Sequence, residues 1–294
     1  MFSVSGLNKS YTYNLVAMKN RKQLLAFGLI TSMSLAFSAC DKDEPMAAKD
    51  ISLRETSLGK VLTDDKGMTL YYFTKDVAGA SLCSGGCLTN WPIFAYEGTL
   101  EVGDGLNTSD FTTITRTDGT KQTAYKGWPL YYFHDDKAAG DVKGENVNSV
   151  WVVAKPAYTI MLANQQLVGN DGKSYKSDYT EGTGETQFFV DGQGRTLYTF
   201  IKDKKDMNKY TKEDFSNDAN WPIFTAEIED LPSALDKSLF NVITVFNKKQ
   251  LTYKGWPIYY FGADNKVRGA TKGVSVPQPG VWPVVQKGVA PAPI

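Results

Sequence analysis

Three kinds of side chain in this sequence could take part in chemistry: four aspartates that end a repeated motif, two cysteines close together, and a single histidine. The aspartates are Asp76, Asp136, Asp203 and Asp264. Carboxylates gathered in space could hold a cation or act as an acid–base pair. Four equivalent copies favour a structural role instead, in which each aspartate accepts hydrogen bonds from backbone N–H groups at the end of a strand.

Cys83 and Cys87 are separated by Ser84-Gly85-Gly86, a segment flexible enough to close a small ring. In an exported chain, one remaining cysteine pair predicts a disulfide. The alternative is a copper or redox site, because two thiolates at this spacing can hold Cu(I) together with a distant histidine. His134 is the single histidine of the chain, so it would be that third ligand. Otherwise, His134 is an exposed residue at the end of a strand, and the site holds no metal.

Other kinds of site find no support in the sequence. One histidine without a recognisable nucleophile does not make a catalytic triad, and no phosphate-binding or dinucleotide-binding glycine motif is present. The chain carries 32 basic and 32 acidic residues without a basic cluster, which argues against binding to nucleic acid. We therefore predict no catalytic residues and no enzyme activity.

The aspartates belong to a Tyr-x-Phe-x-x-Asp motif that occurs four times, each copy followed by a tryptophan. The tyrosine and phenylalanine pairs are Tyr71 and Phe73, Tyr131 and Phe133, Tyr198 and Phe200, and Tyr259 and Phe261, and the tryptophans are Trp91, Trp151, Trp221 and Trp282. Repetition at a fixed period sets the architecture of a chain. Residues two apart in a strand share a face, so the tyrosine and phenylalanine of each copy are core candidates.

The four copies divide into two kinds that alternate along the chain, which indicates two tandem modules of two half-repeats, each of roughly 60 residues. We place the modules at residues 53–157 and 158–294. Short alternating runs around Asp-Gly and similar turns predict an all-β fold of antiparallel strands and hairpins, with hairpins over residues 60–73, 111–125 and 187–200. Residues 209–215 and 232–239 are the best candidates for short helices.

Two further tryptophans, Trp128 and Trp256, follow Lys-Gly in the second kind of half-repeat. Exposed aromatic rings could stack on a sugar or contact a protein partner. Aromatic residues at strand spacing are more often part of the core. Exposure of either ring in the folded protein would support a carbohydrate-binding surface, and burial of both would remove this alternative.

The N-terminal segment indicates export. Basic residues precede a short apolar stretch that ends in Ser38-Ala39-Cys40, which is the arrangement of a bacterial lipoprotein signal. Residues 1–39 would be the upstream segment and signal, with Met18 as an alternative start, and Cys40 would carry the lipid. Residues 40–52 would be a tether, and its acidic start predicts outer-membrane anchoring at the cell surface. The periplasmic face of that membrane is the alternative location.

Several of these residues together resemble a known family, the bacterial secreted-repeat lipoproteins with tandem Tyr-x-[Phe/Trp/Tyr]-x-x-Asp motifs. The resemblance is carried by residues 67–76, by the cysteine loop before Asn90-Trp91-Pro92, and by residues 125–131, and it extends over roughly residues 57–287. It implies an exported, lipid-anchored repeat protein without an established activity. The second module lacks the cysteine pair, which puts a shared role of that pair in doubt.

Taken together, the sequence predicts a lipid-anchored binding or envelope-structural module without a cofactor, with a protein or glycan as partner. The alternatives are a copper or redox protein that uses Cys83 and Cys87, and a carbohydrate-binding surface module.

Overall fold

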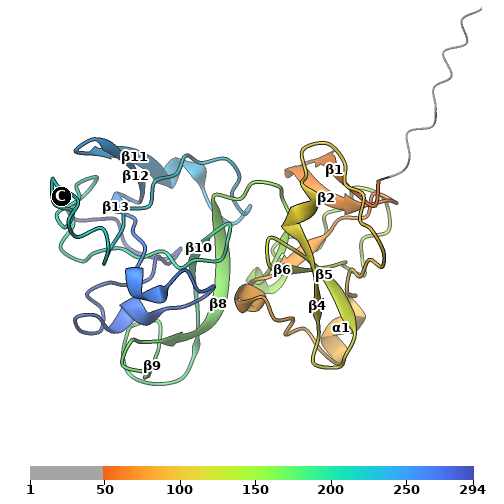
Figure 1. The fold of residues 1–294 in the computed structure, drawn as a ribbon, viewed down its shortest axis with the longest axis horizontal. Helices are drawn as coiled ribbons and strands as arrows, with labels where there is room; N and C mark the ends of the chain where they lie inside the picture. Colours follow the sequence, from red (N-terminus) through yellow and green to blue (C-terminus); the bar gives the residue numbers. More distant parts are fainter. Residues whose placement is uncertain (1–48) are drawn as a thin grey trace, which may run out of the picture. The chain divides into compact units, whose positions relative to one another are not determined.

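The computed structural model describes residues 49–294, which Figure 1 draws in colour. Short antiparallel strands dominate this part of the chain, so the predicted all-β class with repeated units is confirmed. Cys40 and the predicted signal lie outside the described residues. A strand already begins at Ile51, inside the residues expected to form the tether. None of the helical segments in residues 49–294 has the length and hydrophobicity of a membrane span.

The first half of the fold contains a hairpin and a five-stranded sheet. The hairpin pairs β1 (Ile51–Thr56) with β2 (Gly59–Asp64). The sheet has the order β4-β5-β6-β3-β7, and its strands are β4 (Phe111–Thr115), β5 (Lys121–Tyr125), β6 (Trp128–Tyr131), β3 (Tyr71–Phe73) and β7 (Trp151–Val153). The motif strand β3 therefore lies between β6, which carries the second copy of the motif tyrosine, and β7, which carries the tryptophan.

The second half of the fold follows the same plan with two three-stranded sheets. One has the order β10-β8-β9 and the other β11-β12-β13. Their strands are β8 (Ile160–Val168), β9 (Ser174–Tyr175), β10 (Glu185–Asp191), β11 (Phe240–Val245), β12 (Lys248–Tyr253) and β13 (Trp256–Pro257). Between residues 49 and 294, no strand pairing joins β1–β7 to β8–β13.

The hairpin expectations are met in full in one case and in part in two. β4 and β5 form an antiparallel hairpin whose turn has Gly119 at φ 83°, a left-handed conformation that glycine adopts without strain. The hairpin expected over residues 60–73 is short: it consists of the Thr63–Thr69 bridge and the backbone hydrogen bonds on either side of it. The hairpin expected over residues 187–200 is equally short and is built around the Val190–Thr196 bridge. Beyond these short hairpins, each motif segment pairs with more distant parts of the chain.

The helical segments are all short. They are η1 (Thr74–Ala78), α1 (Gly86–Asn90), η2 (Thr108–Asp110), η3 (Val147–Ser149), η4 (Lys237–Leu239), η5 (Gly262–Asp264) and η6 (Lys272–Ser275). The helix expected over residues 232–239 is reduced to η4, and the one over residues 209–215 does not form. There, the Asn208 side chain accepts hydrogen bonds from the N–H groups of Tyr210 and Thr211, which satisfies them without a helix.

The core consists of four apolar clusters of buried residues, and β3 contributes to two of them. Tyr71 and Phe73 belong to a cluster made by the first half alone. Tyr72 points to the other face, as strand alternation requires, and joins a cluster that includes Tyr158 and Met161 from the second half. Burial of apolar surface therefore continues across the two halves of the described chain.

Candidate functional site

The four motif aspartates are bound crosswise by the four motif tyrosines. In the first module, Tyr71 donates its hydroxyl hydrogen to Asp136 at 2.6 Å, and Tyr131 donates to Asp76 at 2.6 Å. In the second module, Tyr198 donates to Asp264 at 2.6 Å and Tyr259 donates to Asp203 at 2.8 Å. Each half-repeat thus supplies both a donor and an acceptor to its neighbour, which locks the two half-repeats of a module together.

Each aspartate also accepts one backbone N–H from the loop that follows its motif. The donors are Leu82, Lys143, Lys209 and Lys272, at 2.7–3.0 Å. Burial raises the pKa of Asp76, Asp203 and Asp264 to about 7, and it also raises the pKa of Asp136. These carboxyl groups are nearly inaccessible and are occupied by protein donors, so they hold the fold rather than face a substrate.

The remaining motif residues build two aromatic stacks. In the first, Trp91 and Trp151 lie parallel with ring centroids 3.8 Å apart, and Phe73 and Phe133 cover the two outer faces at 4.2 and 4.5 Å. The second stack repeats this arrangement with Trp221 and Trp282 at 3.7 Å, covered by Phe200 and Phe261. All four tryptophans are buried. Two copies of the Tyr-x-Phe-x-x-Asp motif and their two tryptophans therefore form one packing unit, and the fold contains two such units.

Cys83 and Cys87 lie at disulfide-bonding distance, with Cα atoms 5.4 Å apart. Chain entropy predicts that so short a ring stabilises the fold by about 2 kcal/mol. The loop is held a second time by Arg116, which donates to the Cys83 carbonyl at 2.6 Å and to Gln122 at 2.9 Å. The second module has no cysteine pair. There, the side-chain amide of Asn208 donates to the Gln250 side chain at 2.8 Å. The disulfide thus secures a loop that the second module secures with polar contacts.

His134 is not assembled with the cysteines into a metal site. Its Nε2 lies 3.2 Å from the Asp135 carboxylate, and its side chain is 40% exposed. Across residues 49–294, no three His, Cys, Asp or Glu side chains lie close enough together to hold a metal ion. The copper alternative would therefore require reduction of the disulfide and a rearrangement of the loop.

The two candidate stacking residues differ in exposure. Trp128 is only 2% exposed, and its ring packs against Tyr72 at 4.9 Å. Trp256 is half-buried and donates its Nε1 hydrogen to the Ala290 carbonyl at 2.8 Å. Burial therefore removes Trp128 as an exposed sugar platform, although Trp128 lines a large cleft, whereas Trp256 remains partly exposed.

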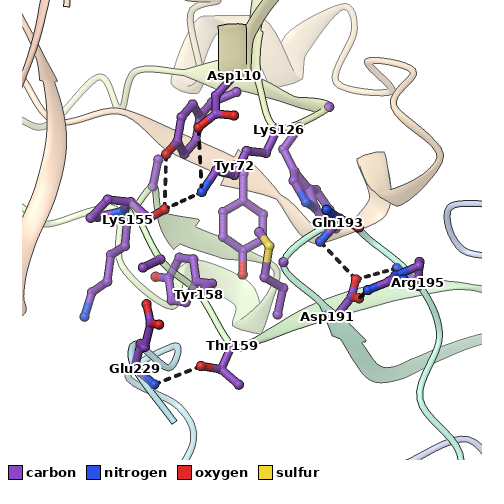
Figure 2. Close-up of a pocket in the computed structure, with 18 of the residues that line it drawn as sticks. Tyr72, Asp110, Lys126, Lys155, Tyr158, Thr159, Asp191, Gln193, Arg195 and Glu229 are labelled. Carbon is purple, nitrogen blue, oxygen red and sulfur yellow. Dashed lines mark hydrogen bonds and ion pairs between the residues drawn. The ribbon is translucent and has the colours of Figure 1, made fainter. Parts of the chain in front are cut away.

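That cleft has a volume of about 790 Å³ and is lined by both halves of the fold. Figure 2 shows Tyr72 at its centre, with Lys155 and Tyr158 on one side and Gln193, Asp191 and Arg195 on the other. The buried rings of Tyr72, Trp128 and Tyr158 belong to the apolar cluster shared by the two halves. Strand alternation explains the arrangement, because the residue between the motif tyrosine and phenylalanine must face away from the crosswise pairs.

Most of the charged groups of the cleft are paired within the protein. Arg195 contacts Asp191 at 2.5 Å, Lys155 lies 3.4 Å from Asp230, and Lys126 lies 3.8 Å from Asp110. The Asp191 carboxylate is fixed further by the Tyr260 hydroxyl at 2.8 Å. These pairs form a polar rim around the aromatic floor.

Arg268 crosses the floor of the cleft between the two halves. Its Nε donates to the Val77 carbonyl at 2.9 Å, and its Nη1 donates to the carbonyls of Lys126 at 2.9 Å and Gln193 at 2.6 Å. The guanidinium lies over the Trp128 ring, 4.8 Å from the centroid. Gly127 makes room for it, because a Cβ there would lie 2.9 Å from Nη1. Arg268 therefore joins three segments that are far apart in the sequence.

The sequence predicts only one residue of this cleft as a candidate for binding, Trp128. Tyr72 occupies the variable position of the motif, and Asp191 and Gln193 lie in the expected turn within residues 187–200. Arg268 carried no signal at all, because its role depends on carbonyls from three distant loops.

The family model Lipoprotein_15, described as a secreted repeat of unknown function, matches residues 52–95, 112–155 and 247–286. These segments contain the first, second and fourth copies of the motif, so the match is narrower than the expected 57–287 and omits the third copy. No match was found among curated proteins or among solved structures. Three segments of this chain are thus similar to a secreted repeat of unknown function.

Proposed function

We propose that this chain is an exported, lipid-anchored binding module without enzyme activity, and that its ligand occupies the cleft between the two halves of the fold. The observation that carries the proposal is that the aromatic and acidic residues fall into two groups with different contacts. The tyrosines, phenylalanines and aspartates of the repeated motif contact one another and the four tryptophans inside the protein. Other aromatic and acidic residues, among them Trp128, Tyr158 and Asp191, line the cleft.

The cleft has the properties of a small-ligand site. Its volume of about 790 Å³ lies within the range of such sites, which are apolar depressions with a few placed polar groups at a junction between modules. The aromatic floor is rigid because its rings are packed into the shared core. Paired charges at the rim fix the orientation of Asp191 and Lys155 before any ligand arrives. These features support binding of a small molecule or of one part of a larger glycan or peptide.

The export part of the proposal rests on the signal-like N-terminus and on the similarity to a secreted repeat. A lipid on Cys40 would anchor the module to the outer membrane, with the cell surface as its location. Membrane fractionation of cells that produce a Cys40→Ala variant tests the anchor. We expect the variant to move to the soluble fraction, and its retention in the membrane fraction would contradict lipidation at Cys40.

A cleft-filling substitution tests where the ligand binds. Gln193 is exposed at the cleft, so Gln193→Trp should fill part of its volume without disturbing the buried floor. The matched control is Glu213→Trp, an exposed position that does not line the cleft. Saturation-transfer NMR would use N-acetylglucosamine, glucose, glucuronate and triglycine as probes.

We expect at least one probe to bind the unmodified protein and the Glu213→Trp control, and to lose about tenfold or more in affinity with Gln193→Trp, a change equal to about 1.4 kcal/mol. Equal binding to all three proteins would place the ligand elsewhere. Absence of binding by every probe would remove the support for a small-ligand cleft.

A further inference from the structure

Three polar atoms in the wall of the cleft are buried and have no hydrogen-bond partner within residues 49–294: the Tyr72 hydroxyl oxygen, Trp128 Nε1 and Arg268 Nη2. Tyr72 and Trp128 are 1% and 2% exposed. The three side chains are neighbours, because the Tyr72 ring lies 4.9 Å from the Trp128 ring and the Arg268 guanidinium 4.8 Å from it. Eight buried polar side-chain atoms lack a partner within residues 49–294, and these three belong to adjacent side chains that line one cleft. Buried polar atoms are nearly always paired in folded proteins, so this grouping favours a ligand at the cleft.

The chemistry of the three atoms indicates which kind of ligand group could bond to them. Indole Nε1 and guanidinium Nη2 can only donate hydrogen bonds, and a tyrosine hydroxyl can also donate. The wall therefore matches a group that offers several acceptor oxygens and no hydrogens. A carboxylate or a phosphate has this property, and bonds from donors to an ionised acceptor are the stronger ones.

The contacts of Arg268 agree with an anionic partner. Among the cleft residues that the structure describes, Lys126, Lys155 and Arg195 each lie within 4.0 Å of a carboxylate, whereas Arg268 does not. Its guanidinium contacts carbonyl oxygens and the Trp128 ring, and its charge is favoured from a distance by Asp191, which is paired with Arg195. Burial outweighs this effect and lowers the pKa of Arg268 to about 10, so the charge is only partly compensated. A bound anion would complete the compensation at this side of the cleft, which is also lined by the carboxylates of Glu227 and Glu229.

We propose that the cleft recognises a small anionic ligand whose carboxylate or phosphate oxygens accept hydrogen bonds from Tyr72, Trp128 and Arg268. This inference rests on the proposed function, since it names the ligand class of the same cleft. The joining role of Arg268 remains separate, because that role uses Nε and Nη1 and leaves Nη2 for the ligand.

Three probes with one sugar ring test the ligand class: glucuronate, glucose 6-phosphate and glucose, titrated into the purified full-length protein by calorimetry. We expect at least one anion to bind about tenfold or more tightly than glucose. Preference for glucuronate would identify a carboxylate ligand, and preference for glucose 6-phosphate a phosphate ligand. Glucose binding as tightly as both anions would overturn the anion inference and leave the binding cleft standing.

The Tyr72→Phe variant tests the donors directly, because it removes one unpaired hydroxyl and keeps the ring. We expect its melting temperature to equal or exceed that of the unmodified protein, and its affinity for the preferred anion to fall about tenfold. Trp128→Phe provides a second, independent loss of one donor. Unchanged anion affinity in both variants, or no binding of either anion while a neutral probe still binds, would overturn the inference without affecting the proposed function. If no probe of any kind binds, both fail.

Discussion

Replacing Trp282 by alanine is expected to destabilise the second module by about 3–5 kcal/mol. Trp282 is 2% exposed and lies between Trp221 and Phe200, with ring centroids at 3.7 and 4.3 Å. The rings of Tyr259 and Tyr210 make T-shaped contacts with the indole, with ring centroids at 5.2 and 4.8 Å. Removal of the indole leaves a large cavity and breaks both stacked contacts. Such a loss is a large fraction of the total stability of a domain, so partial unfolding at 37 °C is expected.

Denaturant unfolding followed by circular dichroism measures this effect. Trp256→Ala is the matched control, because Trp256 is only half-buried and makes one hydrogen bond, to Ala290. We expect the control to lose about 1–2 kcal/mol. Trp282→Phe should lose less than Trp282→Ala, since a phenyl ring can remain in the stack. If Trp282→Ala is no less stable than Trp256→Ala, the stack is not the centre of the module.

The stability of the fold is expected to decrease as the pH rises from about 4 to 8. Burial raises the folded-state pKa of Asp76, Asp203 and Asp264 to about 7, whereas an unfolded aspartate titrates near 3.9. Between these values the folded protein holds protons that the unfolded chain has released, so rising pH favours unfolding. Each carboxyl group contributes a slope of up to about 1.4 kcal/mol per pH unit while it titrates, and the full destabilisation is present above pH 7. Aspartates with a lowered pKa, such as Asp141, act below pH 4 and do not affect this window.

Asp203→Asn isolates one of these groups, because an amide resembles the protonated carboxyl and does not titrate. Relative to the unmodified protein, the variant should gain stability as the pH rises from 5 to 8. Asp135→Asn is the control, since Asp135 neighbours a motif aspartate but its side chain is 57% exposed. We expect the control to keep the pH dependence of the unmodified protein. Chemical denaturation at pH 5, 6, 7 and 8 gives the comparison, and a protein more stable at pH 8 than at pH 5 would contradict the expected sign.

Much of the fold follows from the sequence because the repeat fixes it. Strand alternation correctly separates Tyr71 and Phe73 from Tyr72, and the turn chemistry correctly predicts the hairpin over residues 111–125. Local pattern does not specify the partner of a strand. For this reason the expected hairpins at residues 60–73 and 187–200 are confirmed only next to their turns, and the motif segments then pair with distant parts of the chain. The crosswise pairing of Tyr131 with Asp76 could likewise not be predicted from the sequence, since only the sheet brings the two residues together.

The candidate site was less predictable than the fold. Its floor contains one residue from the variable position of the motif, Tyr72, and one tryptophan outside it, Trp128. Arg268 reaches the cleft only because three loops present their carbonyls to it. Each of these contacts is long-range, and none leaves a spacing or composition signal. The repeated motif is the clearest signal in the sequence, yet its tyrosines, phenylalanines and aspartates pack and pair inside the fold.

Two neighbouring tyrosines provide the most direct test of this division between scaffold and site. The Tyr71 hydroxyl is bonded to Asp136 at 2.6 Å, whereas the Tyr72 hydroxyl is buried without a partner. The measurement is the free energy of unfolding of Tyr71→Phe and Tyr72→Phe under identical conditions. We predict a loss of about 1–3 kcal/mol for Tyr71→Phe and no loss for Tyr72→Phe. Equal losses, or a greater loss for Tyr72→Phe, would contradict the assignment of the motif to the scaffold and of Tyr72 to the ligand site.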